Sequence, residues 1–276
     1  MKIGIMSAAF PDLSFAEVLD FLSGNGFRSI EGACWPAGAG KDRKYGGVAH
    51  PEVGSLSRTR VDEIRGECAA KGVEISVLGY YPNPLDDDLE HRGRVVAHLK
   101  QVILGAEKPG GRRRWYVHRE ACRHRRQELA GEPRPALRRV HEGLARPGPV
   151  CRRSQREDRH RALPDALVRH LARGQQPGLL PGHPTSVSFT ISAQDMVLDE
   201  EMCYQHGILS AGIGVQQRRI PGMGRVNWQE VIKALYNAGY DHALNIEHED
   251  PNWEGSVDKV KQGFLTARRF LAVYTA

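Results

Sequence analysis

The sequence predicts an α/β fold built around a parallel β-sheet. Short apolar segments alternate with amphipathic, helix-like segments through the first 108 residues, and the alternation returns in the last third of the chain. Such alternation is typical of parallel strands joined by helical crossovers. A third observation is the loss of periodicity between Gly111 and Leu180. It predicts that the sheet is interrupted in the middle of the chain.

The first half of the chain is expected to begin with a buried strand over residues 2–9. A helix follows, in which Ser14 and Glu17 form a capping box and Gly24 or Gly26 ends the helical segment. The pattern continues with strands in RSIEGACWP and VEISVLGYYPNP, and with helices over residues 59–72, ended by Gly72, and 91–108. The glycine-rich GAGKDRKYGG lacks the Gly-Lys-Ser/Thr of a Walker motif, so we expect a loop there.

The last third of the chain resumes the same alternation. A helix is expected from Asn227 in NWQEVIKALYNAGY, and a strand in HALNIEHED. A closing helix follows in SVDKVKQGFLTARRFLAVY, with Ser256 as its cap.

The cysteines and the N-terminus indicate the cellular setting. Five cysteines without a CxxC spacing argue against a disulfide scaffold or a structural zinc site and favour a reducing compartment. The N-terminal MKIGIMSAAFPD is typical of a first strand rather than a signal peptide, and no apolar run approaches the length of a membrane span. We therefore expect a cytoplasmic protein with a single domain over residues 1–276 and no membrane partner. Whether the protein forms a homo-oligomer stays an open question at this point.

The middle of the chain has an unusual charge distribution. Gly111–Leu180 contains 18 Arg, 7 acidic residues and no Lys, a net charge of +11, which leaves −5 for the rest of a chain whose total is +6. The segment also contains no Ile or Phe. A polyanion-binding module would be expected to show a helical face or interleaved aromatic residues. Here Trp115 and Tyr116 are the only aromatic residues, so we expect no specific nucleic-acid partner.

Two long strings near the C-terminus carry a family resemblance. Residues 206–228 contain R-I-P-G-x-G-x-V-N-W, and residues 239–264 contain I-E-H-E-D-P-x-W-E-G. Together with GFRSIEGACWP and VEISVLGYYPNPLD, these strings resemble the sugar phosphate isomerase/epimerase family. The resemblance covers residues 1–108 and 195–276 and implies a (β/α)8 TIM barrel of the xylose-isomerase-like type. Because the pattern fails in between, we expect an incomplete barrel with strands four to six disrupted.

The resemblance implies a divalent metal (Mn, Mg, Co or Zn) at the mouth of the barrel, where the carboxyl ends of the strands lie. The implied ligands are a Glu on the fifth strand, an Asp in D-P-S-H, a His in H-V-H-A-K-D and a Glu on the last strand. Only the last is present, as Glu247 in NIEHED. Thr190–Asp195 takes the place of H-V-H-A-K-D, with Ser192 where a ligand would be, and D-P-S-H is missing. His206 and His248 are weaker candidates, since a lone His is more often structural. We therefore expect little or no tight metal binding.

The candidate site residues follow from the same resemblance. Glu247 is the expected metal ligand and catalytic acid/base, since a carboxylate on an apolar strand is costly to bury without a partner. Arg219 resembles the substrate-contacting Arg of the family and suits bidentate binding of phosphate or carboxylate. Arg218 could play the same part, and an exposed loop Arg is the alternative. Candidate sugar contacts at the ends of strands two and three, for which packing at the rim is the alternative, are Glu31, Trp35, Tyr80 and Tyr81.

The arginine-rich segment has an explanation at the level of codons. We suppose that each residue is read from the last base of one codon and the first two of the next. The family-like string Pro-Gly-Gly-Asn-Asn-Leu-Ala-Tyr-Ser-Pro-Ala-Ile, with G or C in most third positions, then becomes residues 173–183 as they stand. We therefore interpret about 109–185 as a frame-shifted reading of a family member and expect 109–188 to be poorly ordered. The sixth strand and its Asp, expected after His183, are interpreted as deleted.

The implied chemistry is that of a metal-dependent sugar or sugar phosphate isomerase or epimerase. A metal would polarise the carbonyl and stabilise an enediolate, while two carboxylates exchange the proton. Whether this chain is a competent enzyme or an inactive form stays open at this point. Two further alternatives are a non-enzymatic polyanion binder acting through the Arg-rich segment and, ranked below it, a relative of the abasic-site endonucleases.

Overall fold

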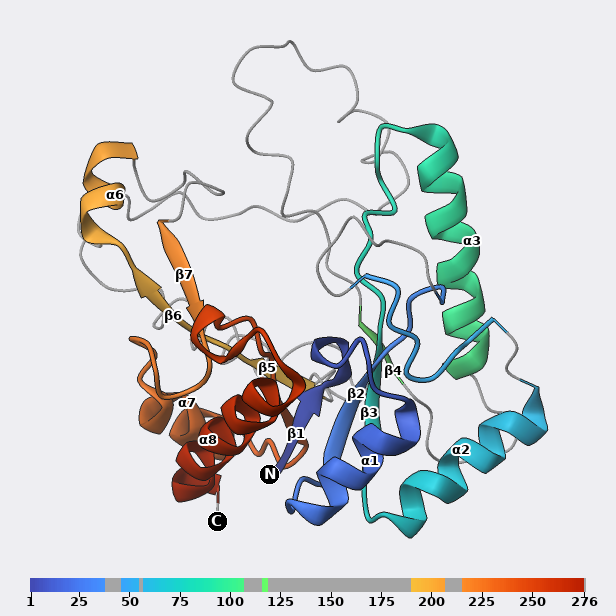
Figure 1. Ribbon diagram of the computed structural model, residues 1–276, viewed down its shortest axis with the longest axis horizontal. Helices are drawn as coiled ribbons and strands as arrows, with labels where there is room; N and C mark the ends of the chain where they lie inside the picture. Colours follow the sequence, from blue (N-terminus) through green and yellow to red (C-terminus); the bar gives the residue numbers. More distant parts are fainter. Residues whose placement is uncertain (38–45, 55–56, 107–115, 119–189, 207–214, 276) are drawn as a thin grey trace, which may run out of the picture.

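The computed structural model describes residues 1–37, 46–54, 57–106, 116–118, 190–206 and 215–275 (Figure 1). In this part of the chain the main sheet has six parallel strands in the order β4-β3-β2-β1-β8-β5, and helices cover its outer face. The strands of this sheet are β1 (Lys2–Met6), β2 (Ser29–Ala33), β3 (Glu74–Gly79), β4 (Tyr116–His118), β5 (Thr190–Ala193) and β8 (Ala243–Ile246). The helices that accompany it are α1 (Phe15–Gly24), α2 (Arg58–Ala70), α3 (Leu89–Ala106), α7 (Trp228–Asn237) and α8 (Val257–Thr275).

The expected helix starts and stops are confirmed where the chain carries capping residues. The Ser14 hydroxyl accepts the Glu17 N–H, and the Glu17 carboxylate accepts the Ser14 N–H at 2.7 Å, which completes the capping box of α1. These hydrogen bonds from Ser14 lower the pKa of Glu17. Asn227 caps α7 through the Glu230 N–H, and the Ser256 hydroxyl accepts the Lys259 N–H at the start of α8.

The sheet is strongly curved, as in the wall of a barrel. Two strands, β2 and β1, separate β3 from β8, so in a flat sheet β3 and β8 would lie about 14 Å apart. The Asn245 side chain on β8 nevertheless donates to the Ser76 hydroxyl on β3 at 2.8 Å, and to the Thr190 hydroxyl on β5 at 2.7 Å. These contacts bring side chains of three strands together on the inner face. The prediction of an incomplete (β/α)8 barrel is therefore confirmed.

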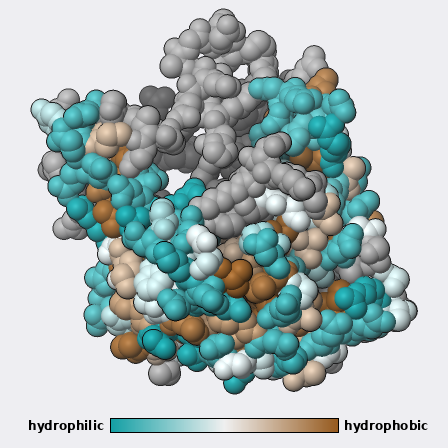
Figure 2. Space-filling model, viewed as in Figure 1, coloured by the Kyte–Doolittle hydropathy of each residue, from teal (hydrophilic) through white to brown (hydrophobic). Residues whose placement is uncertain are grey.

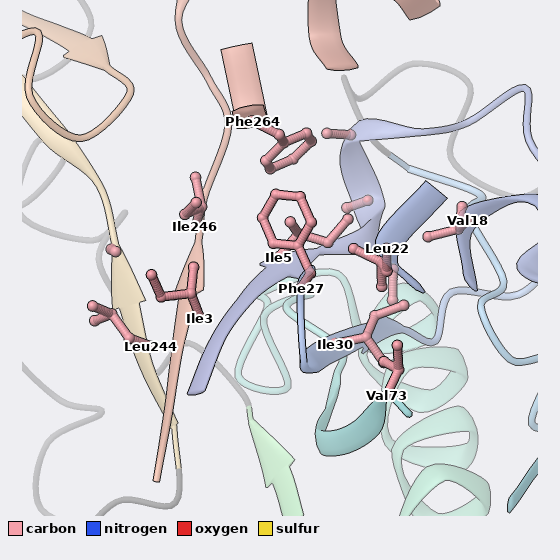
Figure 3. Close-up of a cluster of buried hydrophobic side chains, with 14 of the residues drawn as sticks. Ile3, Ile5, Val18, Leu22, Phe27, Ile30, Val73, Leu244, Ile246 and Phe264 are labelled. Carbon is pink, nitrogen blue, oxygen red and sulfur yellow. The ribbon is translucent and has the colours of Figure 1, made fainter. Parts of the chain in front are cut away.

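The hydrophobic core lies between the sheet and the surrounding helices. Figure 3 shows Ile5, Ile30 and Ile246 pointing from adjacent strands toward the same side of the sheet, where Val18, Leu22 and Phe264 of the helices meet them. All six side chains are almost completely buried. Because side chains alternate between the two faces of a strand, the residues on either side of these isoleucines must point into the barrel.

Strand positions in the barrel can be assigned from the pairing. In an eight-stranded barrel the last strand pairs with the first and the seventh, and β8 here pairs in parallel with β1 and β5. The strand β5 therefore takes the seventh place, and it lies in the Thr190–Asp195 segment that takes the place of H-V-H-A-K-D. The strand β4 pairs with β3 and takes the fourth place, within the segment where we expected no strand. The expectations for strands five and six, and for most of 109–188, concern residues that lie outside the described part.

An additional hairpin that the sequence did not predict follows β5. It consists of β6 (Asp195–Leu198) and β7 (Gln216–Arg219), paired antiparallel, with α6 (Glu200–His206) after β6. In Figure 1 this hairpin extends away from the barrel sheet. Figure 2 shows a mainly hydrophilic surface with smaller hydrophobic patches. Within the described ranges, no helix combines the length and apolar character that crossing a bilayer requires.

Candidate functional site

Two carboxylates, Glu31 in the middle of β2 and Glu247 directly after β8, lie at one level on the inner face of the barrel, the level at which β1 ends. Glu31 pairs with Met6, and Ile246, which precedes Glu247, pairs with Ile5. Ile30 and Ile246 face the helices, so Glu31 and Glu247 face the interior. Two strand spacings separate β2 from β8, so the backbones of the two glutamates are about 10 Å apart. The two carboxylates therefore belong to one layer of the barrel interior.

Glu31 is fully buried and lies beside Tyr81. A methyl group at Gly79 would come within 3.0 Å of the Glu31 Oε1 atom and 2.6 Å of the Tyr81 hydroxyl oxygen. Both polar groups therefore approach the same point of the β3 backbone, where only glycine leaves room for them. This brings two of the four expected sugar contacts together.

The other two expected sugar contacts, Trp35 and Tyr80, pack against each other. Their ring centroids are 5.6 Å apart in an edge-to-face arrangement, and Tyr80 also packs on His98 at 4.6 Å. The Nε2 atom of His98 lies at hydrogen-bond distance, 2.8 Å, from the Cys34 carbonyl. Burial raises the pKa of Tyr80 to about 12. These contacts favour the alternative of packing at the rim.

Glu247 lies at the end of β8 with a half-buried side chain. Its backbone N–H donates to the Ala193 carbonyl at 3.0 Å, so the ladder between β8 and β5 continues up to this residue. Ser192 on β5 pairs with Asn245, two residues before Glu247. Ser192, the residue expected in place of a metal ligand, therefore lies on the neighbouring strand β5. It is one layer deeper in the barrel than Glu247.

The two arginines of β7 face acidic residues that follow Glu247. Arg218 forms an ion pair with Glu249, which also accepts from the Gln194 amide at 3.0 Å. The Arg219 guanidinium lies 3.9 Å from the buried carboxylate of Asp250 and donates to the Arg218 carbonyl at 2.8 Å. Only 17% of the Arg219 side chain is exposed, which differs from the exposed loop Arg of the alternative.

Two buried aspartates near these arginines were not among the candidates. Asp195 accepts hydrogen bonds from the backbone N–H groups of Gly222 and Val226 and from the Trp228 indole. Asp250 accepts from the Ile220 N–H at 3.2 Å. Asp250 lies within the string I-E-H-E-D-P-x-W-E-G, so the sequence offered a signal for it, whereas the donors that surround Asp195 come from distant positions in the chain.

Of the two candidate histidines, His248 packs in the interior of the protein. His248 is 2% exposed, and its ring packs on Phe264 with centroids 5.0 Å apart. A methyl group at Gly263 would lie 2.5 Å from the His248 Nε2 atom, so α8 is closely packed on this ring. His206 is the last residue of α6.

A divalent metal does not fit the side chains that are placed here. Across the described ranges, no group of three or more His, Cys, Asp or Glu residues is arranged to hold a metal ion. Glu31 and Glu247 supply two carboxylates, and the neighbouring strand supplies the Ser192 hydroxyl rather than an imidazole. The expected fifth-strand and sixth-strand ligands fall outside the described residues.

Comparison with known proteins gives structural matches only. No protein-family model matches the chain, and no curated protein sequence matches it. Solved structures do match. A D-psicose 3-epimerase crystallised with D-fructose is 15% identical, with a TM-score of 0.50, over 100% of this chain and 99% of the other. A D-psicose 3-epimerase from Clostridium cellulolyticum H10 with D-tagatose is 13% identical, with a TM-score of 0.49 and coverage of 100% and 99%. A xylose isomerase-like TIM barrel protein from Mycobacterium smegmatis in complex with magnesium is 18% identical, with a TM-score of 0.48 and coverage of 100% and 98%.

At this level of identity the comparison shows the fold. The alignment with the first of these structures spans nearly the full length of both chains. The resemblance of the sequence strings to the xylose-isomerase-like barrels is thus confirmed at the level of the fold. Fold alone does not fix a reaction, because one barrel supports many chemistries through its mouth.

Proposed function

We propose that this chain binds a small sugar at the mouth of its barrel. Its fold is that of the xylose-isomerase-like (β/α)8 barrels, and we propose that it derives from a sugar isomerase or epimerase. One observation carries the proposal, namely the placement of Glu31 and Glu247 at one level of the inner face. Active sites of such barrels lie at this end. Carboxylates on the two strands that flank β1 suit the hydroxyl groups of a sugar, because hydrogen bonds to a charged acceptor are stronger than those between neutral groups.

In this proposal Glu247 is the carboxylate that binds the sugar in this chain, at the position where the family resemblance implies a catalytic acid/base. Glu31 on β2 and Tyr81 after β3 orient the sugar hydroxyls from the strands on the other side of β1. Arg219 borders the site from β7. Trp35 and Tyr80 support the wall behind Glu31 through their mutual packing.

The family resemblance implies a divalent metal that would polarise the carbonyl, but the side chains described here do not fit one. Ser192 supplies a hydroxyl where the family has an imidazole, and a hydroxyl is a weak ligand compared with a carboxylate or imidazole. We therefore assign no step to a metal. We propose that sugar binding is retained in this form and that isomerase or epimerase turnover is lost.

The proposal is tested by titrating the protein with D-fructose in a calorimeter. The wild-type chain is expected to bind. Glu247→Gln is expected to raise the dissociation constant about tenfold or more, which is the usual effect of losing a hydrogen bond to a charged group. Glu230→Gln is the matched control, because Glu230 is an exposed glutamate on α7. Equal binding by wild type and Glu247→Gln would contradict the proposed site.

Turnover and metal content are measured on the same preparation. After dialysis we expect far less than one divalent ion per chain, and no conversion of D-fructose when manganese or magnesium is added. A stoichiometric, tightly held cation, or measurable conversion that Glu247→Gln abolishes, would overturn the proposed loss of turnover. Either result would leave the assignment of the sugar site intact.

A further inference from the structure

The carboxylate of Asp195 is fully buried and receives four hydrogen bonds. Its Oδ1 atom accepts from the N–H groups of Met196 at 2.8 Å and Val226 at 3.0 Å. Its Oδ2 atom accepts from the Gly222 N–H at 3.1 Å and the Trp228 Nε1–H at 3.0 Å. A buried charge is expensive to desolvate unless its hydrogen-bonding capacity is filled in this way.

The segment Pro221–Val226 is shaped to enclose this carboxylate. A methyl group at Gly224 would lie 2.2 Å from the Asp195 Oδ1 atom, so only glycine permits the approach. Gly222 has a φ of +91°, and a methyl group there would lie 2.7 Å from the Phe270 ring. The Arg225 N–H donates to the Met196 carbonyl at 2.9 Å. The string P-G-M-G therefore folds around Asp195.

The other end of the same segment is held by the second buried aspartate. The Ile220 N–H donates to the Asp250 Oδ2 atom at 3.2 Å, and the preceding Arg219 faces the Asp250 Oδ1 atom at 3.9 Å. Arg218 pairs with Glu249, two residues after Glu247. The path of the chain from β7 to α7 is thus fixed at both ends, and the two arginines end beside the residues that follow Glu247.

We infer that Asp195 is a positioning residue that acts as a built-in anion. Backbone N–H groups and an indole surround its carboxylate much as such groups surround a bound phosphate. The carboxylate thereby holds Arg218–Trp228 in the conformation that keeps Arg218 and Arg219 at the mouth. The effect on ligand affinity rests on the proposed sugar site, whereas the positioning itself does not.

The positioning is tested without any ligand, by hydrogen–deuterium exchange followed by peptide mass spectrometry. In Asp195→Asn one acceptor becomes a donor that faces other donors. Peptides spanning 218–228 are therefore expected to exchange about ten- to a hundredfold faster, while peptides of β1 and β2 keep their wild-type rates. Asp199→Asn is the matched control, because Asp199 lies on the same hairpin but its carboxylate accepts from Met202 of α6. Unchanged exchange over 218–228 in Asp195→Asn would overturn the inference.

Rescue by an added anion separates positioning from a general loss of stability. Asp195→Ala leaves a space of carboxylate shape, and formate is expected to restore slow exchange over 218–228 where chloride at equal ionic strength does not. If Asp195→Ala does not fold, Trp228→Phe removes one of the four donors and should show a smaller local increase in exchange. Equal effects of formate and chloride, or an increase spread over the whole chain, would overturn the inference.

A binding experiment with D-fructose distinguishes the proposed sugar site from the positioning role of Asp195. If the wild-type chain binds D-fructose, Asp195→Asn is expected to weaken binding severalfold and Asp199→Asn to leave it unchanged. If the wild-type chain does not bind, the proposed sugar site fails, but the exchange measurements still decide the role of Asp195. Wild-type affinity in an Asp195→Asn protein whose segment 218–228 exchanges rapidly would overturn the link from positioning to binding.

Discussion

Asn245 is the residue that ties the inner face of the barrel together. It is 1% exposed and donates from one amide nitrogen to the hydroxyls of Ser76 and Thr190, on two other strands. A methyl group at Gly4 would lie 2.2 Å from its Oδ1 atom, so the side chain also fills the space that glycine leaves on β1. The layer just beneath Glu31 and Glu247 is therefore polar and held by a single amide.

Replacement of this amide should destabilise the whole sheet. Asn245→Ala removes the two hydrogen bonds that the amide donates to the Ser76 and Thr190 hydroxyls, and it opens a cavity. We therefore expect the free energy of unfolding to fall by about 1–3 kcal/mol. Denaturant titration of the two proteins measures the difference. Asn252→Ala, at an exposed position, should change it by less than about 0.5 kcal/mol. A similarly small change for Asn245→Ala would show that the interior network contributes little.

The lowered pKa of His50 predicts how the free energy of unfolding depends on pH. Burial lowers the pKa of His50, although hydrogen bonds to the backbone at Leu13 and Ser7 oppose the shift. In the unfolded chain the pKa is about 6.5, so between the two values the unfolded state binds more protons than the folded state. The free energy of unfolding should therefore fall as the pH decreases below about 6.5.

The His50→Gln variant isolates this contribution. Glutamine can still donate to the Leu13 carbonyl, which lies 2.7 Å from the His50 Nε2 atom, but it does not titrate. We expect the loss of stability between pH 7.5 and pH 5.5 to be smaller in His50→Gln than in the wild type, as measured by denaturant midpoints. His242→Gln, at a partly exposed histidine, is the control. Identical slopes in all three proteins would refute the role of His50.

At the scale of elements, local signals were sufficient where caps and periodicity agree. The capping box at Ser14, the Asn227 cap of α7 and the positive φ of Gly72 after α2 each fix a helix end through nearby residues. The hairpin of β6 and β7 could not be found in this way. Its strands have four residues each, and 17 residues separate Leu198 from Gln216, so only their antiparallel pairing defines them.

The candidate site shows the same division between local and distant information. Glu31 and Glu247 were identifiable because each is a carboxylate within or just after an apolar strand. Asp195 was not, because its importance comes from donors at positions 222, 226 and 228, which the fold brings to it. Trp35 and Tyr80 were chosen for their place at strand ends. Which way an aromatic ring turns there depends on partners such as His98, which lies on another element.

At the scale of the whole molecule, the described strands leave a defined gap in the barrel. The strand β4 takes the fourth place and β5 the seventh, and residues 119–189 between them lie outside the described part of the chain. The same stretch contains most of the arginine excess. The hypothesis of a reading-frame change in the gene would connect the two facts, because codons rich in G and C yield many arginines when they are read one base out of phase.

Sequencing the gene across codons 105–195 tests this explanation. Reading the DNA one base earlier or later is expected to give strand-like segments, with Gly-Thr-Phe-Ile-Gly at the place of β4 and Lys-Ile-Ala-Ile-Glu in place of residues 158–161. The second segment would restore the fifth-strand carboxylate opposite Glu247. A protein expressed from the corrected frame should then hold a divalent ion more tightly than the present chain, as metal analysis after dialysis would show. An uninterrupted frame that encodes the arginine-rich segment, together with related genes that share it, would instead establish that segment as genuine protein sequence and leave the missing ligands as a property of this barrel.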